Sequence, residues 1–249
     1  MLRHLVLACF ISSTLGDGPP SNRIVGGAQA ARQQFPFVAA LHTQQGEQVC
    51  GAVIVSDRWI LTAAHCTIGV RPHMLQVMVG SIDRTIGGQL YDVELIINHP
   101  DFNQFTLNND IALLRTIRPI EMSTTVQPIK MGESPVLDGQ IGTVSGWGMV
   151  DERMEAAVML QFLDVRTLNY RDCAMRHNYH NANKIHSSSL CTTSLFGQGT
   201  CMGDSGGPLV VNHTVVGIVS WGVPCATGIP DVFTSVPSHR AWIRSTAGI

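Results

Sequence analysis

Short runs of β-branched and apolar residues, each bounded by Gly, Pro or Asp, follow one another along most of this 249-residue chain. Runs of this length and composition are typical of β-strands. The pattern predicts strands at 49–55, 59–62, 75–79 and 91–98 and, after a connector at about 126–138, at 140–146, 161–167, 208–211, 214–221 and 231–235. The fold class is therefore expected to be all-β.

Two short helices are predicted in addition to these strands. Asn169 is a good N-cap and predicts a helix over 170–176. The second helix is predicted at 237–245, near the C-terminus, with Trp242 and Ile243 facing inward. The sequence shows no internal repeat.

The first 16 residues have the pattern of a secretory signal peptide. Arg3 and His4 form a basic start, residues 5–11 are apolar, and Thr14 and Gly16 offer cleavage positions. The alternative, a membrane anchor, requires about 20 apolar residues, and neither this run nor any later one is that long. We therefore expect a secreted, soluble protein with no membrane partner.

Residues 17–23 form a polar segment rich in Pro and Gly, which cannot bury enough apolar surface to fold alone. The segment ends at Arg23, directly before Ile24, and is interpreted as an activation peptide. The remaining 226 residues suffice for one large all-β domain or two small barrels. They carry 14 Lys and Arg against 17 Asp and Glu, a net charge of −3, and no basic run, so nucleic acid is not an expected partner.

Six of the seven cysteines follow the signal peptide, and an even set in a secreted chain indicates disulfides. They are Cys50, Cys66, Cys173, Cys191, Cys201 and Cys225. The sequence alone allows about 15 ways of pairing them. Metal binding is the alternative, but no CxxC or HxxxH-like cluster supports it.

Three segments carry the residues of a catalytic triad. Ser205 lies in CMGDSGGP at 201–208, and a serine hydroxyl needs a base to take its proton and donors to hold the oxyanion formed after attack. We predict that His65 is the base and that Asp110 orients it; the order His, Asp, Ser is a known one for such triads. The glycines beside Ser205 let the backbone turn, so that the amides of Gly203 and Ser205 form an oxyanion hole.

Five motifs in this order resemble the chymotrypsin/trypsin family of serine proteases. They are IVGG at 24–27, TAAHC at 62–66, DIALL at 110–114, GDSGGP at 203–208 and SWG at 220–222. The resemblance covers nearly all of residues 24–249, which are expected to form the protease domain. It implies two six-stranded antiparallel β-barrels with the active site between them, together with the short C-terminal helix.

The resemblance also implies an activation step and a set of disulfides. Cleavage after Arg23 by a trypsin-like protease would free the amine of Ile24, which would pair with Asp204; a buried carboxylate needs such a partner. The alternative is that Asp204 only caps a turn. The implied disulfides are Cys50–Cys66, Cys173–Cys191 and Cys201–Cys225.

The resemblance places a primary specificity pocket beside Ser205. The expected substrate-binding residues are Gly199, Thr200, Met202, Ser220, Trp221, Gly222 and Asp231. Trypsins carry an aspartate where this chain has Gly199, and trypsins and chymotrypsins carry a glycine where it has Asp231. This combination looks like arthropod chymotrypsin-like enzymes and the brachyurins, the crab collagenase group, which cleave after large apolar residues and, in brachyurins, also after basic ones. Two interpretations stay open: Asp231 reaches the pocket base, or it turns away to water or a backbone donor.

Two further segments bear on cation binding and on glycosylation. The segment 81–90 offers only Asp83 to a hard cation, which needs several oxygen ligands, so no calcium is predicted. Asn212 begins the one N-x-Ser/Thr sequence of the chain and is a candidate for glycosylation.

The function expected from these features is that of a secreted serine endopeptidase, chymotrypsin-like with dual apolar and basic preference, and without a cofactor. A digestive role is favoured because the activation peptide is minimal and no regulatory domain precedes it. The expected partners are protein or peptide substrates, the activating protease and protein protease inhibitors, and the protein is expected to be a monomer. The alternatives are a narrow-specificity protease of saliva, venom or haemolymph, and a catalytically silent homologue that acts as a binding protein. The complete triad and Gly203 favour catalysis over the silent homologue.

Overall fold

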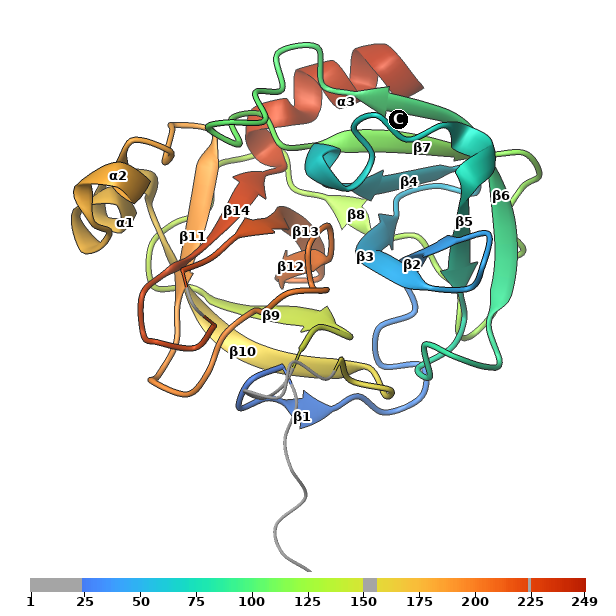
Figure 1. Ribbon diagram of the computed structural model, residues 1–249, viewed down its shortest axis with the longest axis horizontal. Helices are drawn as coiled ribbons and strands as arrows, with labels where there is room; N and C mark the ends of the chain where they lie inside the picture. The colour runs from blue at the N-terminus through green and yellow to red at the C-terminus, as the bar shows by residue number, and fades with distance from the viewer. Residues whose placement is uncertain (1–23, 150–155, 224) are drawn as a thin grey trace, which may run out of the picture.

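The structure, a computed structural model, describes residues 24–149, 156–223 and 225–249. Two β-barrels lie side by side, and a helix crosses one end of the pair (Figure 1). The signal and activation peptides predicted for residues 1–23 lie outside the described residues. No helix within the described ranges is long and apolar enough to span a membrane.

The first barrel closes through six antiparallel strands in the order β2-β3-β4-β7-β6-β5. They are β2 (Val38–Thr43), β3 (Gln48–Ile54), β4 (Trp59–Thr62), β5 (Leu75–Val79), β6 (Gln89–Asn98) and β7 (Ala112–Thr116). Buried apolar side chains such as Leu41, Ile60, Val77 and Leu114 fill it. Removing these side chains from water holds the barrel together.

The second barrel closes because β10 pairs with β9 as well as with β11. Its strands are β9 (Ile141–Gly146), β10 (Gln161–Leu168), β11 (Ser189–Thr193), β12 (Pro208–Val211), β13 (Thr214–Trp221) and β14 (Asp231–Ser235). The short strands β1 (Ala28–Gln29) and β8 (Lys130–Met131) attach to β10 and β13. Val144, Leu209 and Phe233 belong to its core. The two closed six-stranded barrels confirm the expected fold class.

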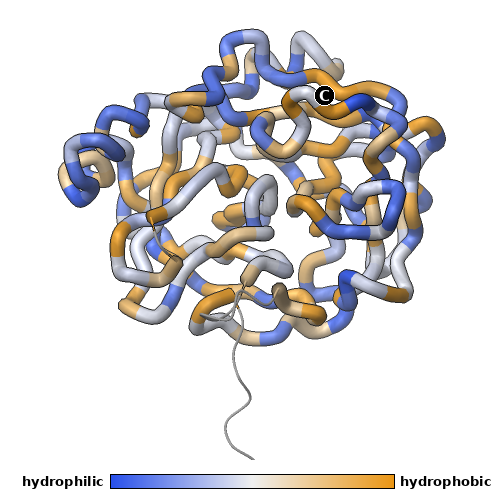
Figure 2. The backbone as a smooth tube through the Cα atoms, viewed as in Figure 1, coloured by the Kyte–Doolittle hydropathy of each residue, from blue (hydrophilic) through white to orange (hydrophobic). Residues whose placement is uncertain are grey.

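The helices lie outside the barrels. They are α1 (Tyr170–Arg176), α2 (Tyr179–Ala182) and α3 (Arg240–Ala247), with the 3-10 turns η1 (Ala64–Cys66), η2 (Pro72–Met74) and η3 (Pro237–His239). In α3, Ile243 is fully buried, whereas Trp242 is half-buried. Figure 2 shows hydrophilic residues along the α1–α2 segment and the outer loops, whereas hydrophobic residues are common in the strands.

Three disulfides fasten loops to the barrels. Cys50–Cys66 joins β3 to η1, Cys173–Cys191 joins α1 to β11, and Cys201–Cys225 joins the segment before Ser205 to the loop before β14. These are the pairs that the resemblance implies.

Candidate active site

His65 lies in η1, directly after β4 of the first barrel. The disulfide between Cys66 and Cys50 ties this turn to β3. The His65 side chain is 28% exposed. Its backbone is therefore held in place, while part of the side chain remains open to the surface.

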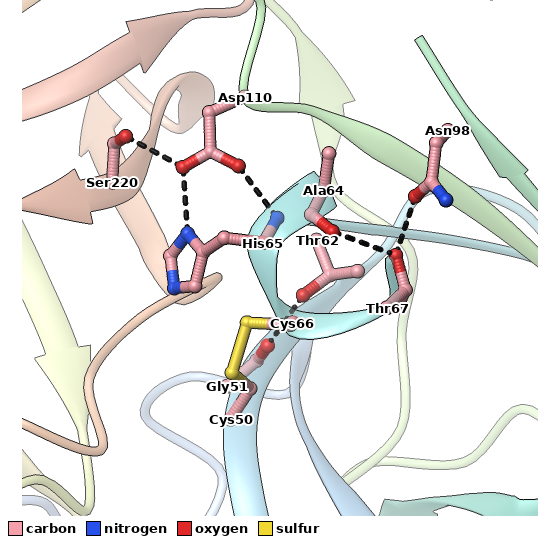
Figure 3. The surroundings of a disulfide bond; sticks show 10 residues. All are labelled: Cys50, Gly51, Thr62, Ala64, His65, Cys66, Thr67, Asn98, Asp110 and Ser220. Carbon is pink, nitrogen blue, oxygen red and sulfur yellow. Dashed lines mark hydrogen bonds and ion pairs between the residues drawn. A yellow bond between two sulfur atoms is a disulfide. The ribbon is translucent and has the colours of Figure 1, made fainter. Parts of the chain in front are cut away.

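Asp110 is fully buried just before β7, and its carboxylate has three partners (Figure 3). Oδ1 accepts a hydrogen bond from the backbone amide of His65 at 2.8 Å. Oδ2 lies 2.7 Å from His65 Nδ1 and accepts from the Ser220 hydroxyl at 2.6 Å. A carboxylate only accepts, so it favours the ring tautomer with the proton on Nδ1 and leaves Nε2 as the basic nitrogen.

Both barrels hold Asp110 in place. The Ser220 hydroxyl comes from β13, and the Thr234 hydroxyl of β14 donates to the Asp110 carbonyl at 2.9 Å. Sequence reasoning missed both contacts. It placed Ser220 in the specificity pocket alone and gave Thr234 no role, because contacts between elements more than 100 residues apart leave no local pattern.

Ser205 lies in the segment that leads into β12 and packs against the first barrel. Its carbonyl accepts from the amide of Gly51 at 2.7 Å. A Cβ at the next residue, Gly206, would overlap Thr62 Oγ1, so this glycine permits the close approach. Thr62 precedes His65 by three residues, and the packing therefore brings Ser205 to the turn that carries the base. Within the described ranges no hydrogen bond joins Ser205 Oγ to His65 Nε2; such bonds are often long without substrate.

The amides predicted to form the oxyanion hole are available. Gly203 has φ +95°, a conformation that glycine adopts without strain, and a Cβ there would lie 3.1 Å from Gly148 Cα. In the part of the chain that the structure describes, the amides of Gly203 and Ser205 donate to no protein acceptor. Two free donors therefore flank the Ser205 side chain.

Asp204 is buried between these donors and β9. Its carboxylate accepts from the amides of Gly148 and Cys201 at 2.8 and 2.9 Å. Burial raises the pKa of Asp204 to about 7, although both amide bonds act in the opposite direction. Among the described residues no cation lies within 4.0 Å of it, so this carboxylate lacks the charged partner that a buried ion requires.

We expect the uncut chain to lose stability as the pH rises from about 4 to about 7, because Asp204 must then ionise in a buried site. Its folded pKa of about 7 lies above the unfolded value of about 3.9. The folded chain therefore binds more protons over this range, and the free energy of unfolding falls with rising pH, by at most about 4 kcal/mol. Urea unfolding of the uncut protein across this range measures the loss.

The matched control for this measurement is Asp204→Asn, which keeps an oxygen acceptor but cannot ionise. Its free energy of unfolding should lack this part of the pH dependence. Parallel pH curves for the two proteins would contradict the assignment.

A cavity of about 800 Å³ opens beside Ser205. Its lining includes five of the expected substrate-binding residues, Thr200, Met202, Ser220, Trp221 and Gly222. The other two, Gly199 and Asp231, are not among the residues that line it. The lining is mostly apolar and includes Val219, Val223 and Ala226, as expected of a site for a large side chain.

Asp231 lies behind the cavity wall. It is 6% exposed, and its Oδ2 accepts from the amide of Thr200 at 2.8 Å. Its two oxygens lie 3.0 Å from the positions that a Cβ would take at Gly199 and at Gly222. The carboxylate therefore lies behind Gly199 and Gly222, and one of its oxygens accepts from a backbone donor.

His177 is a further residue that sequence reasoning missed. Its Nε2 lies 3.0 Å from the carbonyl of Pro230, directly before Asp231. Its ring packs edge-on against Trp221 of the cavity wall, at 5.3 Å between centroids. A single histidine after a short helix carries no local pattern that would predict these contacts with Pro230 and Trp221.

The remaining predicted sites lie away from the cavity. Asn212 and His213 form the two-residue turn between β12 and β13 with φ of 48° and 60°, and Asn212 is exposed, as a glycan would require.

Among the described residues, the one cluster with metal-ligand side chains is Cys50, His65 and Cys66. Its two cysteines form a disulfide and so provide no thiolate.

Comparisons with known proteins show which family this chain resembles over most of its length. The family model described as Trypsin matches residues 24–243. Trypsin alpha-4 of Lucilia cuprina is 35% identical over 255 residues, which cover 99% of each chain. Chymotrypsin-2 of Vespa crabro is 36% identical over 222 residues, 89% of this chain and 98% of the relative. The solved structure of neuropsin, a serine protease expressed in the limbic system of mouse brain, superposes with a TM-score of 0.80 at 31% identity and covers 88% of this chain and 98% of its own.

Proposed function

Because the chain belongs to the trypsin family of serine proteases, we propose that it is a secreted endopeptidase that uses Ser205, His65 and Asp110 to cleave peptide bonds. One observation carries this proposal: a buried carboxylate fixes His65 through Nδ1, and Ser205 lies between two amides that donate to no acceptor among the described residues. The three disulfides support secretion, since such bonds persist in oxidising compartments.

The proposed reaction proceeds through an acyl-enzyme. Ser205 Oγ attacks the carbonyl carbon of the substrate while its proton passes to His65 Nε2. The amides of Gly203 and Ser205 donate to the resulting oxyanion. His65 then gives the proton to the leaving amine, the C–N bond breaks, and a water molecule activated by the same nitrogen releases the acyl group.

The proposed precursor is activated by a trypsin-like protease that cleaves after Arg23, which lies outside the described residues. Ile24 is already buried against the second barrel, among residues such as Val144 and Leu163. A new ammonium group at Ile24 would give Asp204 a cationic partner, which it does not have among the described residues. Because Asp204 lies between Gly203 and Ser205 in the sequence, its pairing would fix the oxyanion hole.

The proposed specificity is chymotrypsin-like with a second, basic preference at P1, the substrate residue before the cleaved bond. The apolar lining of the cavity suits Phe, Tyr and Leu. The Asp231 carboxylate behind Gly199 and Gly222 offers a charge to Arg or Lys. We further propose a digestive role, acting on proteins and peptides. A cleavage profile on a peptide library tests which P1 residues the enzyme accepts and how broad this preference is.

Asp231→Gly is expected to lower kcat/KM for cleavage after Arg and Lys and to spare or improve cleavage after Phe and Leu. A hydrogen-bonded charge contact contributes about 1.5–3 kcal/mol, which corresponds to roughly 10–150-fold in kcat/KM. Removing the carboxylate also removes a charge that an apolar side chain would otherwise have to desolvate. Steady-state kinetics with peptides that differ only at P1 measure both effects.

Asp231→Asn is the matched variant, since it removes the charge while keeping an oxygen acceptor for the Thr200 amide. It should lower kcat/KM for cleavage after Arg and Lys as Asp231→Gly does. If the wild-type enzyme never cleaves after Arg or Lys, the specificity is that of an ordinary chymotrypsin and the role given to Asp231 is wrong.

A further inference from the structure

Asp231 places a carboxylate directly behind the wall of the specificity cavity. Asp231 begins β14, and its carboxylate lies against two glycines of the surrounding segments, Gly199 and Gly222. Either glycine would bring a Cβ to 3.0 Å from a carboxylate oxygen if it were replaced by alanine. Since neither has a side chain, the carboxylate lies close behind the backbone of Gly222, which lines the cavity.

Among the described residues, no positively charged side chain pairs with the Asp231 carboxylate. It forms no ion pair there, and the strands on either side, β11 and β13, contain no Asp, Glu, Lys, Arg or His. The segments 194–203 and 222–229 contain none either. Its donor is the backbone amide of Thr200, at 2.8 Å from Oδ2, and the Thr200 hydroxyl also lowers the pKa of this carboxyl.

Two titratable groups lie near Asp231. Asp204 is linked to it through neighbouring amides, because Thr200 donates to Asp231 and Cys201 donates to Asp204. His177 faces the carbonyl of Pro230 rather than the carboxylate itself. The charge of Asp231 raises the pKa of Asp204, so the two carboxylates disfavour each other's ionised form.

The Asp231 carboxyl is buried and has no cationic partner among the described residues. Its protonated form is therefore accessible near neutral pH. Burial raises the pKa of Asp231 to about 6, and the two hydrogen bonds from Thr200 oppose this rise. The carboxyl is therefore protonated and neutral below about pH 6 and ionised above it. The charge that a bound side chain meets at the cavity wall therefore depends on pH.

We propose that protonation of Asp231 switches the primary specificity of the enzyme: the ionised carboxylate accepts Arg and Lys at P1, whereas the neutral acid leaves a pocket for apolar side chains. This inference rests on the proposed function. It adds that the class of side chain accepted at P1 depends on pH. Arg or Lys gains a partner only when the carboxylate is charged. An apolar side chain that expels water from the cavity meets a smaller desolvation penalty when the wall is neutral.

The test is the ratio of kcat/KM for two peptides that differ only in Arg or Leu at P1, measured with the activated enzyme from pH 5 to 8.5. Both reactions use the same His65 and Ser205, so changes in the catalytic machinery cancel in the ratio. Because kcat/KM reports the free enzyme, the ratio should rise with pH through a midpoint near the pKa of about 6 and then level off. The expected total rise is roughly 10–150-fold.

Two variants identify the titrating group. Asp231→Asn should give a ratio that does not change with pH, and its activity on the Leu peptide shows that it is folded. Thr200→Val removes one donor to the carboxylate but keeps the backbone amide, so its midpoint should move to higher pH.

The possible outcomes separate this inference from the proposed function. Cleavage after Arg and Leu at a ratio that is constant with pH would overturn the switch and leave the dual specificity intact. A pH-dependent ratio that persists in Asp231→Asn would overturn it too, since another group would then titrate. Cleavage after Leu alone at every pH would contradict the dual specificity itself, and cleavage of neither peptide would contradict the proposed function.

Discussion

Replacing Ser205 by alanine is expected to lower kcat by on the order of 10⁶-fold, and His65→Ala should lower it by a similar factor. The reason is that the hydroxyl and the imidazole act together: without the base the nucleophile is not activated, and without the nucleophile the base has nothing to activate. The double variant should therefore be little worse than either single variant. Steady-state kinetics of the three activated proteins on one peptide measure these losses.

Asp110→Asn gives an intermediate outcome for comparison. An asparagine at this position keeps the shape but presents a donor or a weaker acceptor to His65 Nδ1, so kcat should fall by about 10⁴-fold at neutral pH. Losses that multiply independently in the Ser205 and His65 double variant would contradict the roles assigned to these residues.

Activation is expected to depend completely on Arg23 and Asp204. The Arg23→Gln protein should remain inactive after treatment with trypsin, because the chain is not cut before Ile24. The Asp204→Asn protein should be cut but should lose at least about 10²–10³-fold in kcat, the range found when an oxyanion hole loses a donor. Its new ammonium group would face an amide in place of the buried carboxylate, which among the described residues accepts from the amides of Gly148 and Cys201.

Arg32→Gln is the matched control for activation, since Arg32 is an exposed arginine nine residues further along the chain. This variant should be activated as the wild type is, with a new N-terminus at Ile24 by sequencing. Full activity of an uncut Arg23→Gln protein would contradict the proposed activation.

The sequence was a good guide wherever a local pattern decides the structure. The helix predicted over 170–176 has these bounds, because the Asn169 side chain accepts from the amides of Arg171 and Asp172. The strands at 59–62, 75–79, 208–211, 214–221 and 231–235 likewise have the predicted bounds. Each combines a β-branched or apolar run with a clear boundary signal.

Several elements were missed because their patterns are weak. Strand β7 (Ala112–Thr116) was noted only as part of the DIALL motif, and β2 (Val38–Thr43) and β11 (Ser189–Thr193) were not predicted. Strand β2 is almost continuously buried and so lacks the alternation that indicates a strand. The helix predicted at 237–245 begins at Arg240 instead, because Pro237 starts a separate 3-10 turn.

The candidate site shows the same division between local and long-range information. The motifs around His65, Asp110 and Ser205 predicted the candidate residues from the sequence, and in the structure the side chains of His65 and Asp110 are in contact. The Ser220 and Thr234 contacts to Asp110, and the location of Asp231 behind the cavity wall, depend on the register of β13 and β14. Such registers are set by the closure of the whole barrel, so no short stretch of sequence contains them.

Covalent labelling of Ser205 tests the central claim most directly. The chain is cut after Arg23, treated with an organophosphate such as diisopropyl fluorophosphate, and analysed by peptide mass spectrometry. We expect one phosphoryl group on Ser205 in the cut wild-type protein, with fluoride released, and no label in the Ser205→Ala or His65→Ala variants or in the uncut Arg23→Gln protein. An unlabelled Ser205 in a correctly cut and folded protein would contradict the account and favour a catalytically silent homologue.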